Sequence, residues 1–206
     1  ELLASGDNTF TEAFIDPEEM TILLFTSGTT AQSKAVMLNQ KNICTNLIAM
    51  FSMLYIDRND VFFSVLPLHH TYECTCGFLG QVYRGTTVAI CEGLRYITTN
   101  IKEAKPTCVL MVPVMLEMFY KAIMKKVNSD PKTAKKLKTG IKLSRFILKL
   151  HIDIRRKLFA EIHETFGGRM RLIILGGAPV NPEILQFFRD VGFLCLQGYG
   201  LTECAP

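Results

Sequence analysis

The sequence predicts an α/β fold in which a mainly parallel sheet is flanked by helices. Short apolar segments alternate along the chain with segments of helical periodicity, and neither internal repeats nor low-complexity tracts interrupt them. This alternation is typical of parallel strands joined by crossover helices. With 206 residues, of which 49% are hydrophobic and 20% charged, the chain is long and apolar enough to bury a sizeable core.

Six segments are expected to form strands because they are short, apolar and rich in β-branched or aromatic residues. They are Thr21–Phe25, Val61–Leu66, Thr86–Cys91, Cys108–Val112, Arg171–Leu175 and Phe193–Leu196. Three helices are expected where apolar residues recur at steps of three and four. They span Asn39–Leu54, Val114–Val127 and Asn181–Val191. An asparagine suited to capping opens the first and the third of these helices.

The segment from Lys121 to Lys149 carries nine lysines and one arginine against a single acid, Asp130. Such runs usually solvate a surface, and a helical hairpin is the simplest structure for this one. The same charge could also meet anionic lipids or the phosphates of a bulky substrate. We therefore expect no more than weak peripheral contact with a membrane.

The remaining composition excludes several classes of protein. The net charge of +4 is modest and aromatic residues do not alternate with basic ones, so no nucleic-acid partner is expected. The seven cysteines are an odd number without CxxC spacing, which favours free thiols in a reducing cytoplasm. No segment approaches the roughly 20 apolar residues that a membrane-spanning helix needs.

The stretch LLFTSGTTAQSK, residues 23–34, runs from an apolar strand into a loop of hydroxyls and glycine. Such a loop suits a polyphosphate, and Lys34 supplies a cation. The spacing approaches the P-loop pattern, but Ser33 replaces its second glycine and Ala35 replaces the hydroxyl that binds magnesium. A P-loop NTPase is therefore disfavoured, and the magnesium ligand must come from elsewhere.

Glu203 is the candidate for that ligand. It closes QGYGLTE, residues 197–203, which follows another apolar segment and includes Tyr199, an aromatic side chain able to stack on a base. GGAP, residues 176–179, also follows an expected strand and precedes an expected helix. Because ligands of open α/β sheets gather at the carboxyl ends of strands, the three loops together predict one phosphate-binding site.

The motifs FTSGTTAQSKAV, LPLHHTYE, GGAP and QGYGLTE, in this order, make the chain resemble the AMP-forming acyl-CoA synthetases of the adenylate-forming superfamily. The resemblance covers essentially the whole chain. The LPLHHTYE form and the long basic segment are most similar to bacterial long-chain fatty-acid CoA ligases. The resemblance implies an enzyme that uses ATP and Mg²⁺ to convert a fatty acid to acyl-AMP, and then passes the acyl group to the thiol of coenzyme A.

The resemblance also implies a role for each motif. The loop residues that would cradle the β and γ phosphates are Thr26, Ser27, Gly28, Thr29, Thr30 and Lys34. The residues that would line the adenine and acyl pocket are Gly177, Ala178 and Pro179. His70 would lie near the acyl carboxylate, in a motif that Glu73 closes.

The last motif is expected to hold the adenylate and the metal. Tyr199, with Gly200 beside it, would stack on adenine. Thr202 would touch the α phosphate and Glu203 would bind magnesium. The residues expected to be catalytic are Lys34, His70, Thr202 and Glu203.

Three loop positions depart from the usual family pattern: Ala31, Ser33 and Ala35 stand where glycine, proline and glycine are usual. The two alanines in place of glycine restrict the backbone, while the loop hydroxyls and Lys34 are kept. The family's ribose-binding aspartate and C-terminal lysine follow the last motif, so residues 1–206 are expected to be the central part of the AMP-binding N-terminal domain, inactive alone. Two alternatives stay open: another acid–thiol ligase or amino-acid adenylating domain of the superfamily, and a non-catalytic nucleotide-binding module.

Overall fold

The central element of the fold is a sheet of five parallel strands, which confirms the predicted α/β class. The computed structural model describes residues 6, 14–26 and 34–206. The strand order is β4-β3-β5-β6-β7. The strands are β3 (Val61–Ser64), β4 (Thr87–Ile90), β5 (Cys108–Met111), β6 (Leu172–Leu175) and β7 (Leu194–Gln197). Each lies inside a predicted segment or within one residue of it.

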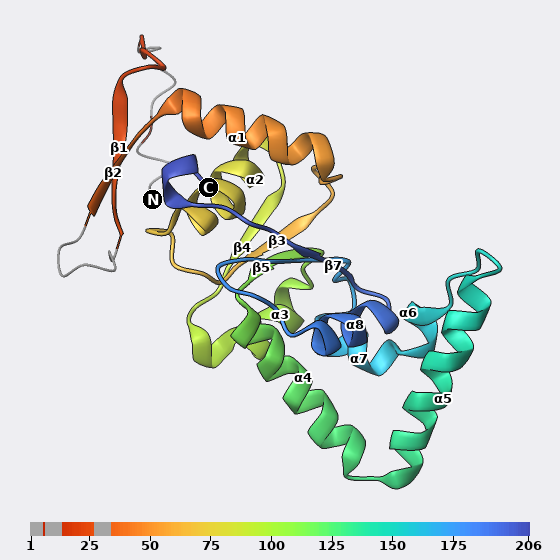
Figure 1. Cartoon of the computed structure of the whole chain (residues 1–206). Helices are drawn as coiled ribbons and strands as arrows, with labels where there is room; N and C mark the ends of the chain where they lie inside the picture. The colour runs from red at the N-terminus through yellow and green to blue at the C-terminus, as the bar shows by residue number, and fades with distance from the viewer. Residues whose placement is uncertain (1–5, 7–13, 27–33) are drawn as a thin grey trace.

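Helices cover both faces of this sheet (Figure 1). Alternate residues of each strand point to opposite faces, so Phe62 and Leu110 belong to one apolar cluster and Phe63 and Met111 to the other. The first face is covered by α1 (Gln40–Met53), the π-helix η1 (Tyr72–Leu79) and α2 (Gly80–Arg84). The second face is covered by α3 (Ile97–Ala104), α4 (Pro113–Asn128), α7 (Ala160–Thr165) and α8 (Pro182–Asp190).

The three predicted helices are confirmed as α1, α4 and α8, and both predicted asparagine caps are present. The side chain of Asn39 accepts a hydrogen bond from the backbone N–H of Asn42 at 2.8 Å, and Asn181 accepts one from Glu183 at 2.9 Å. The short elements η1, α2, α3, η2 (Leu94–Tyr96), α6 (Arg155–Leu158) and α7 were not predicted. They are too short for a helical period to stand out in the sequence.

The basic segment forms a helical hairpin, as expected. It consists of the end of α4, a turn at Asp130 and the helix α5 (Pro131–Leu148). The carboxylate of Asp130 caps α5 by accepting hydrogen bonds from the backbone N–H groups of Lys132 and Thr133. No helix in the part of the chain that the structure describes is both long enough and apolar enough to cross a bilayer.

The first predicted strand exists, but its assignment to the parallel sheet was wrong. β1 (Met20–Thr26) pairs antiparallel with an unpredicted strand, β2 (Lys34–Asn39), in a separate two-stranded sheet. In β2, Val36 and Leu38 are buried while Met37 between them is exposed. This alternation suits an antiparallel strand with one solvated face, whereas β5 and β6 are buried on both faces.

Candidate functional site

The chain reverses direction across the sheet between β3 and β5. From β3 the chain passes to β4 on one side, whereas β5, β6 and β7 follow on the other side of β3. In open α/β sheets ligands bind at such a switch point, beyond the carboxyl ends of the strands. Three of the predicted motifs follow β3, β6 and β7 at this edge.

The GGAP and QGYG loops lie side by side because the strands that precede them are neighbours. Leu175 pairs with Gln197 in the parallel register, and the backbone N–H of Gly198 donates to the carbonyl of Leu175 at 2.7 Å. Gly177 has φ +81°, a left-handed conformation that favours glycine. Gly177, Ala178 and Pro179 are all exposed, so this edge presents an accessible backbone.

Tyr72 joins the LPLHHTYE motif to the GGAP loop. Its hydroxyl donates to the carbonyl of Ile174 at 3.1 Å, and burial raises its pKa, which keeps the donor protonated. A Cβ atom added at Gly176 would lie 2.8 Å from Cζ of Tyr72, so only glycine fits against this ring. Tyr72 was not among the predicted site residues, because its contact with Ile174 joins segments 102 residues apart in the sequence.

Glu73 is the most unusual titratable group at this edge. It is fully buried, and its Oε1 accepts a hydrogen bond from Oγ of Ser64, the last residue of β3, at 2.6 Å. Its Oε2 is buried without a hydrogen-bond partner among the described residues. Burial raises the pKa of Glu73 to about 7, and the Ser64 bond opposes that shift only in part. A carboxyl group beside an apolar core is therefore poised between its two charge states near neutral pH.

His70 is exposed beside this buried pair. Its ring lies 4.4 Å from the ring of His69, between centroids, and its backbone N–H donates to the carbonyl of Pro67 at 3.1 Å. The turn therefore fixes the backbone of His70 and leaves its imidazole at the surface. An exposed imidazole at the carboxyl edge is accessible to a bound substrate.

The end of QGYGLTE packs against the β1–β2 hairpin. Thr202 and Glu203 lie in the short 3₁₀ helix η3 (Thr202–Cys204), and Ala205 is buried in a cluster with Val36 and Leu38 of β2. The side-chain amide of Asn46 in α1 donates to the carbonyl of Cys204 at 3.2 Å. The packing brings the last motif to the hairpin that carries Thr26 and Lys34.

Thr26 and Lys34 are direct partners in the antiparallel register, at the end of the hairpin where β1 finishes and β2 begins. The side chain of Lys34 is exposed. Ser27, Gly28, Thr29 and Thr30 lie outside the described residues. The prediction that this loop follows a strand of the parallel sheet was wrong, because β1 belongs to the hairpin.

The exposed side chains of the last motif are suited to a ligand. Tyr199 is 92% exposed, although large aromatic side chains are usually at least partly covered. Glu203 is also exposed. Within residues 14–26 and 34–206, no group of three or more His, Cys, Asp or Glu side chains is close enough to hold a metal ion. The exposed carboxylate of Glu203 nevertheless fits Mg²⁺, which typically binds one or two carboxylates together with substrate phosphates and water.

The structure thus gathers three motifs at one sheet edge and attaches the fourth through η3. It does not join the predicted catalytic side chains directly: in the part of the chain that the structure describes, no hydrogen bond or ion pair connects the side chains of Lys34, His70, Thr202 and Glu203 to one another. A ligand long enough to reach from the hairpin to the sheet edge would have to bridge them.

The model of the family described as AMP-binding enzyme matches residues 3–206. Among curated proteins, long chain acyl-CoA synthetase 2 of Arabidopsis thaliana is 33% identical over 199 residues, covering 88% of this chain and 29% of that protein. Long-chain-fatty-acid–CoA ligase 5 of Rattus norvegicus is 33% identical over 212 residues, covering 92% of this chain and 29% of that protein. The chain therefore spans about 29% of the length of these relatives.

Solved structures show the same fold. The N-terminal domain of FACL13 from Mycobacterium tuberculosis superimposes with a TM-score of 0.68 at 19% identity, covering 98% of this chain and 42% of that one. The o-succinylbenzoate coenzyme A synthetase of Bacillus subtilis, in complex with AMP, superimposes with a TM-score of 0.65 at 22% identity. The match covers 95% of this chain and 32% of that one.

Proposed function

The chain belongs to the AMP-binding enzyme family, and from that premise we propose that it is part of the large AMP-binding domain of a ligase that joins a long-chain fatty acid to coenzyme A. The observation that carries the proposal is the gathering of the LPLHHTYE, GGAP and QGYG motifs at the carboxyl edge of one sheet. Relatives named as long-chain ligases support the choice of substrate.

The proposed reaction has two steps. In the first, an oxygen of the fatty-acid carboxylate attacks the α phosphorus of ATP, and pyrophosphate leaves. In the second, the thiol sulfur of coenzyme A loses its proton to water and attacks the acyl carbonyl, and AMP leaves with the carboxylate oxygen. Catalysis of both steps depends on positioning and on neutralising phosphate charge.

The residues of the chain suit these tasks. Lys34 is exposed at the start of β2, where its ammonium group can attract the leaving pyrophosphate. The exposed ring of Tyr199 offers a face on which adenine can stack, and Thr202 offers a hydroxyl to the α phosphate. The exposed imidazole of His70 is suited to hold the fatty-acid carboxylate.

Glu203 would hold the magnesium ion. When bound, Mg²⁺ neutralises charge that develops on the phosphate oxygens. The exposed carboxylate of Glu203, at the start of η3 beside Thr202, can reach a ligand that Thr202 also contacts.

The proposal includes two expectations about the surroundings of the protein. All seven cysteines lie in the described part of the chain as free thiols, which supports a reducing compartment such as the cytoplasm. A long-chain fatty acid partitions into bilayers, so the protein would also meet membrane surfaces weakly.

The test is fatty-acid-dependent exchange of labelled pyrophosphate into ATP by the full-length protein that contains this chain. Exchange is expected with acids of palmitate length and not with acetate or benzoate. Glu203→Ala should reduce the exchange rate by at least about a hundredfold, because it removes the metal ligand.

Glu161→Ala is the matched control, since the Glu161 side chain is 86% exposed and pairs only with Lys126 in the described structure. Its exchange rate should equal that of the parent protein. Exchange with short or aromatic acids alone would overturn the choice of substrate. Exchange that Glu203→Ala leaves unchanged would overturn the role of Glu203.

A further inference from the structure

The loop that carries His70 is closed at its base by one buried hydrogen bond. We name residues 65–71 the His70 loop; it connects β3 to η1. Oγ of Ser64, the last residue of β3, donates to Oε1 of Glu73 in the first turn of η1 at 2.6 Å. The backbone N–H of Cys74 donates to the carbonyl of His70 at 2.9 Å, so η1 begins directly from that histidine. The two ends of the His70 loop are therefore joined through Glu73.

The carboxyl group of Glu73 lies folded back against its own helix. A Cβ atom added at Gly77 would lie 2.7 Å from Cδ of Glu73, 2.8 Å from Oε2 and 2.9 Å from Oε1. Only glycine at this position leaves room for the carboxyl group. Because the group fills the space between η1 and the end of β3, its removal or displacement would change how η1 packs on the sheet.

No cation pairs with Glu73 in the part of the chain that the structure describes. Lys41 pairs with Glu18, and Arg84 donates to the carbonyl of Ile56. Of the elements that pack against η1, β3 presents only the hydroxyl of Ser64. The titratable groups on η1, on its other neighbours and in the loop are Tyr72, Cys74, Cys76, Lys41, Cys44, Tyr83, Arg84, Cys108, His69 and His70.

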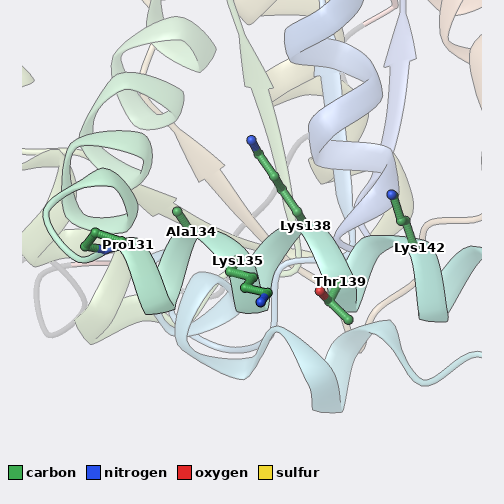
Figure 2. Close-up of a pocket in the computed structure, with 6 residues that line it drawn as sticks. All are labelled: Pro131, Ala134, Lys135, Lys138, Thr139 and Lys142. Atoms are coloured by element: carbon green, nitrogen blue, oxygen red, sulfur yellow. The ribbon is translucent and has the colours of Figure 1, made fainter.

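Basic residues gather instead on the opposite side of the sheet. α5 packs against the apolar cluster of the second face, whereas η1 packs against that of the first. Figure 2 shows Lys135, Lys138 and Lys142 on α5, where they line a hollow. Burial without a cation raises the pKa of Glu73 to about 7. A neutral carboxyl group can stay in this apolar space, but an ionised one is strongly disfavoured there.

We propose that Glu73 is the positioning residue of the His70 loop: by holding η1 against the end of β3, it places the imidazole of His70 where the fatty-acid carboxylate binds. The inference rests on the proposed function for the role of His70. Glu73 is fully buried, so it acts through the loop and does not touch the substrate. The neutral form supports the loop, and ionisation withdraws that support.

The first test measures the His70 loop itself and does not need the reaction. Amide hydrogen exchange of residues 65–71 is followed by mass spectrometry in the full-length protein. Glu73→Ala should speed exchange in the loop about tenfold, whereas Glu73→Gln, which resembles the neutral acid, should stay within about twofold of the parent. Unchanged exchange in Glu73→Ala would overturn the positioning role, whether or not the protein ligates fatty acids.

The matched control is Thr107→Val, which removes a buried hydrogen bond at the opposite edge of the sheet. Thr107 is 6% exposed, directly precedes β5, and donates from its hydroxyl to Asp60 at 2.6 Å. The variant should lower stability and leave exchange in the His70 loop unchanged. Equal acceleration by Thr107→Val and Glu73→Ala would show a general loss of stability and would overturn the proposal.

Gly77→Ala tests the contact that holds the carboxyl group. The added methyl group should displace the carboxyl group, so loop exchange should rise as in Glu73→Ala. In the double variant the methyl group occupies space that the missing carboxyl group has left, and no further acceleration is expected. Additive effects of the two substitutions would contradict the proposed contact.

The consequence for the reaction is measured by fatty-acid-dependent pyrophosphate exchange in the full-length protein. Glu73→Ala should raise KM for the fatty acid about tenfold and leave KM for ATP within about twofold, because only the His70 loop is displaced. Glu73→Gln should restore the parent KM. Equal changes in both KM values would contradict the link to the carboxylate. If the parent shows no such exchange, the proposed function fails, and hydrogen exchange in the loop still decides whether Glu73 positions it.

The pH dependence tests the neutral form. KM for the fatty acid should rise in the parent as the pH passes the pKa of Glu73, about 7, and should rise less in Glu73→Gln. Any change of charge on His70 or on the fatty acid occurs in both proteins, so the difference between the profiles belongs to Glu73. Lys138→Gln, at an exposed position on α5, should follow the parent. Identical profiles of Glu73→Gln and the parent would overturn the role of the neutral carboxyl group.

Discussion

At the level of single residues, Glu73 shows how the fold changes the chemistry of a side chain. The carboxyl group lies between Ser64 of β3 and Gly77 of η1, and a Cβ atom at Gly77 would lie 2.7 Å from Cδ of Glu73. The wide π turn makes room for this buried group, and such turns are frequent at functional sites. Its burial explains why the pKa rises to about 7.

Glu73 is expected to make the protein less stable as pH rises. In the unfolded chain the carboxyl ionises near its ordinary value of 4.5, whereas in the folded protein it keeps its proton up to about 7. As the pH rises, the unfolded state therefore releases its proton first. The free energy of unfolding decreases as the pH rises from the unfolded pKa to the folded pKa. The fall from about pH 5 to about pH 8 should be on the order of 2 to 3 kcal/mol.

Glu73→Gln tests this expectation because the amide resembles the protonated acid and cannot ionise. The variant should match the parent protein at low pH and exceed it in stability at higher pH, in thermal unfolding followed across that range. The exposed Glu19→Gln serves as the control and should follow the parent. A Glu73→Gln variant with the same pH dependence as the parent would contradict the burial of a neutral carboxyl.

At the level of elements, α1 connects the hairpin to the end of the last motif. Its N-cap Asn39 is the last residue of β2, and its residue Asn46 donates to the carbonyl of Cys204. The cap is reciprocal, because the side chain of Asn42 also accepts a hydrogen bond from the backbone N–H of Asn39 at 3.0 Å. The position of α1 thus influences where Thr202 and Glu203 lie.

Asn39→Ala should destabilise the protein by about 1 kcal/mol, since it leaves the first turn of α1 without its capping acceptor. Asn39→Ser keeps an acceptor and should retain most of the stability. Asn39→Asp is a poorer control, because the amide nitrogen of Asn39 lies 3.5 Å from Oε2 of Glu18 and a carboxylate there would be repelled. The shift in the melting temperature measures the loss of stability in Asn39→Ala and in Asn39→Ser. Equal shifts in the two variants would show that the capping acceptor contributes nothing.

At the level of the whole molecule, the sequence was sufficient for the central sheet but not for the hairpin. Strands such as β5 and β6 are buried on both faces, so their apolar runs were visible without knowing their neighbours. The partner of β1 could not be inferred, because β2 continues directly into α1. The alternation of buried and exposed residues in β2 extends over only six residues.

The candidate site, like the fold, was predictable only in part. Loop composition identified the motifs after β6 and β7, and their adjacency followed from the parallel sheet. The role of Ser64 and Tyr72 was not predictable, because each depends on a contact between segments distant in sequence or on different elements. The packing of η3 against β2 likewise required the folded structure.

We propose that the full-length protein activates a fatty acid by joining its carboxylate to the α phosphorus of ATP. The most direct measurement follows a heavy oxygen isotope from a labelled fatty-acid carboxylate during acyl-CoA formation by the full-length protein. The proposed two steps transfer one carboxylate oxygen to the phosphate of AMP, so mass spectrometry should find the label in AMP and none in pyrophosphate. Formation of ADP and inorganic phosphate, or of unlabelled AMP, would contradict the claim.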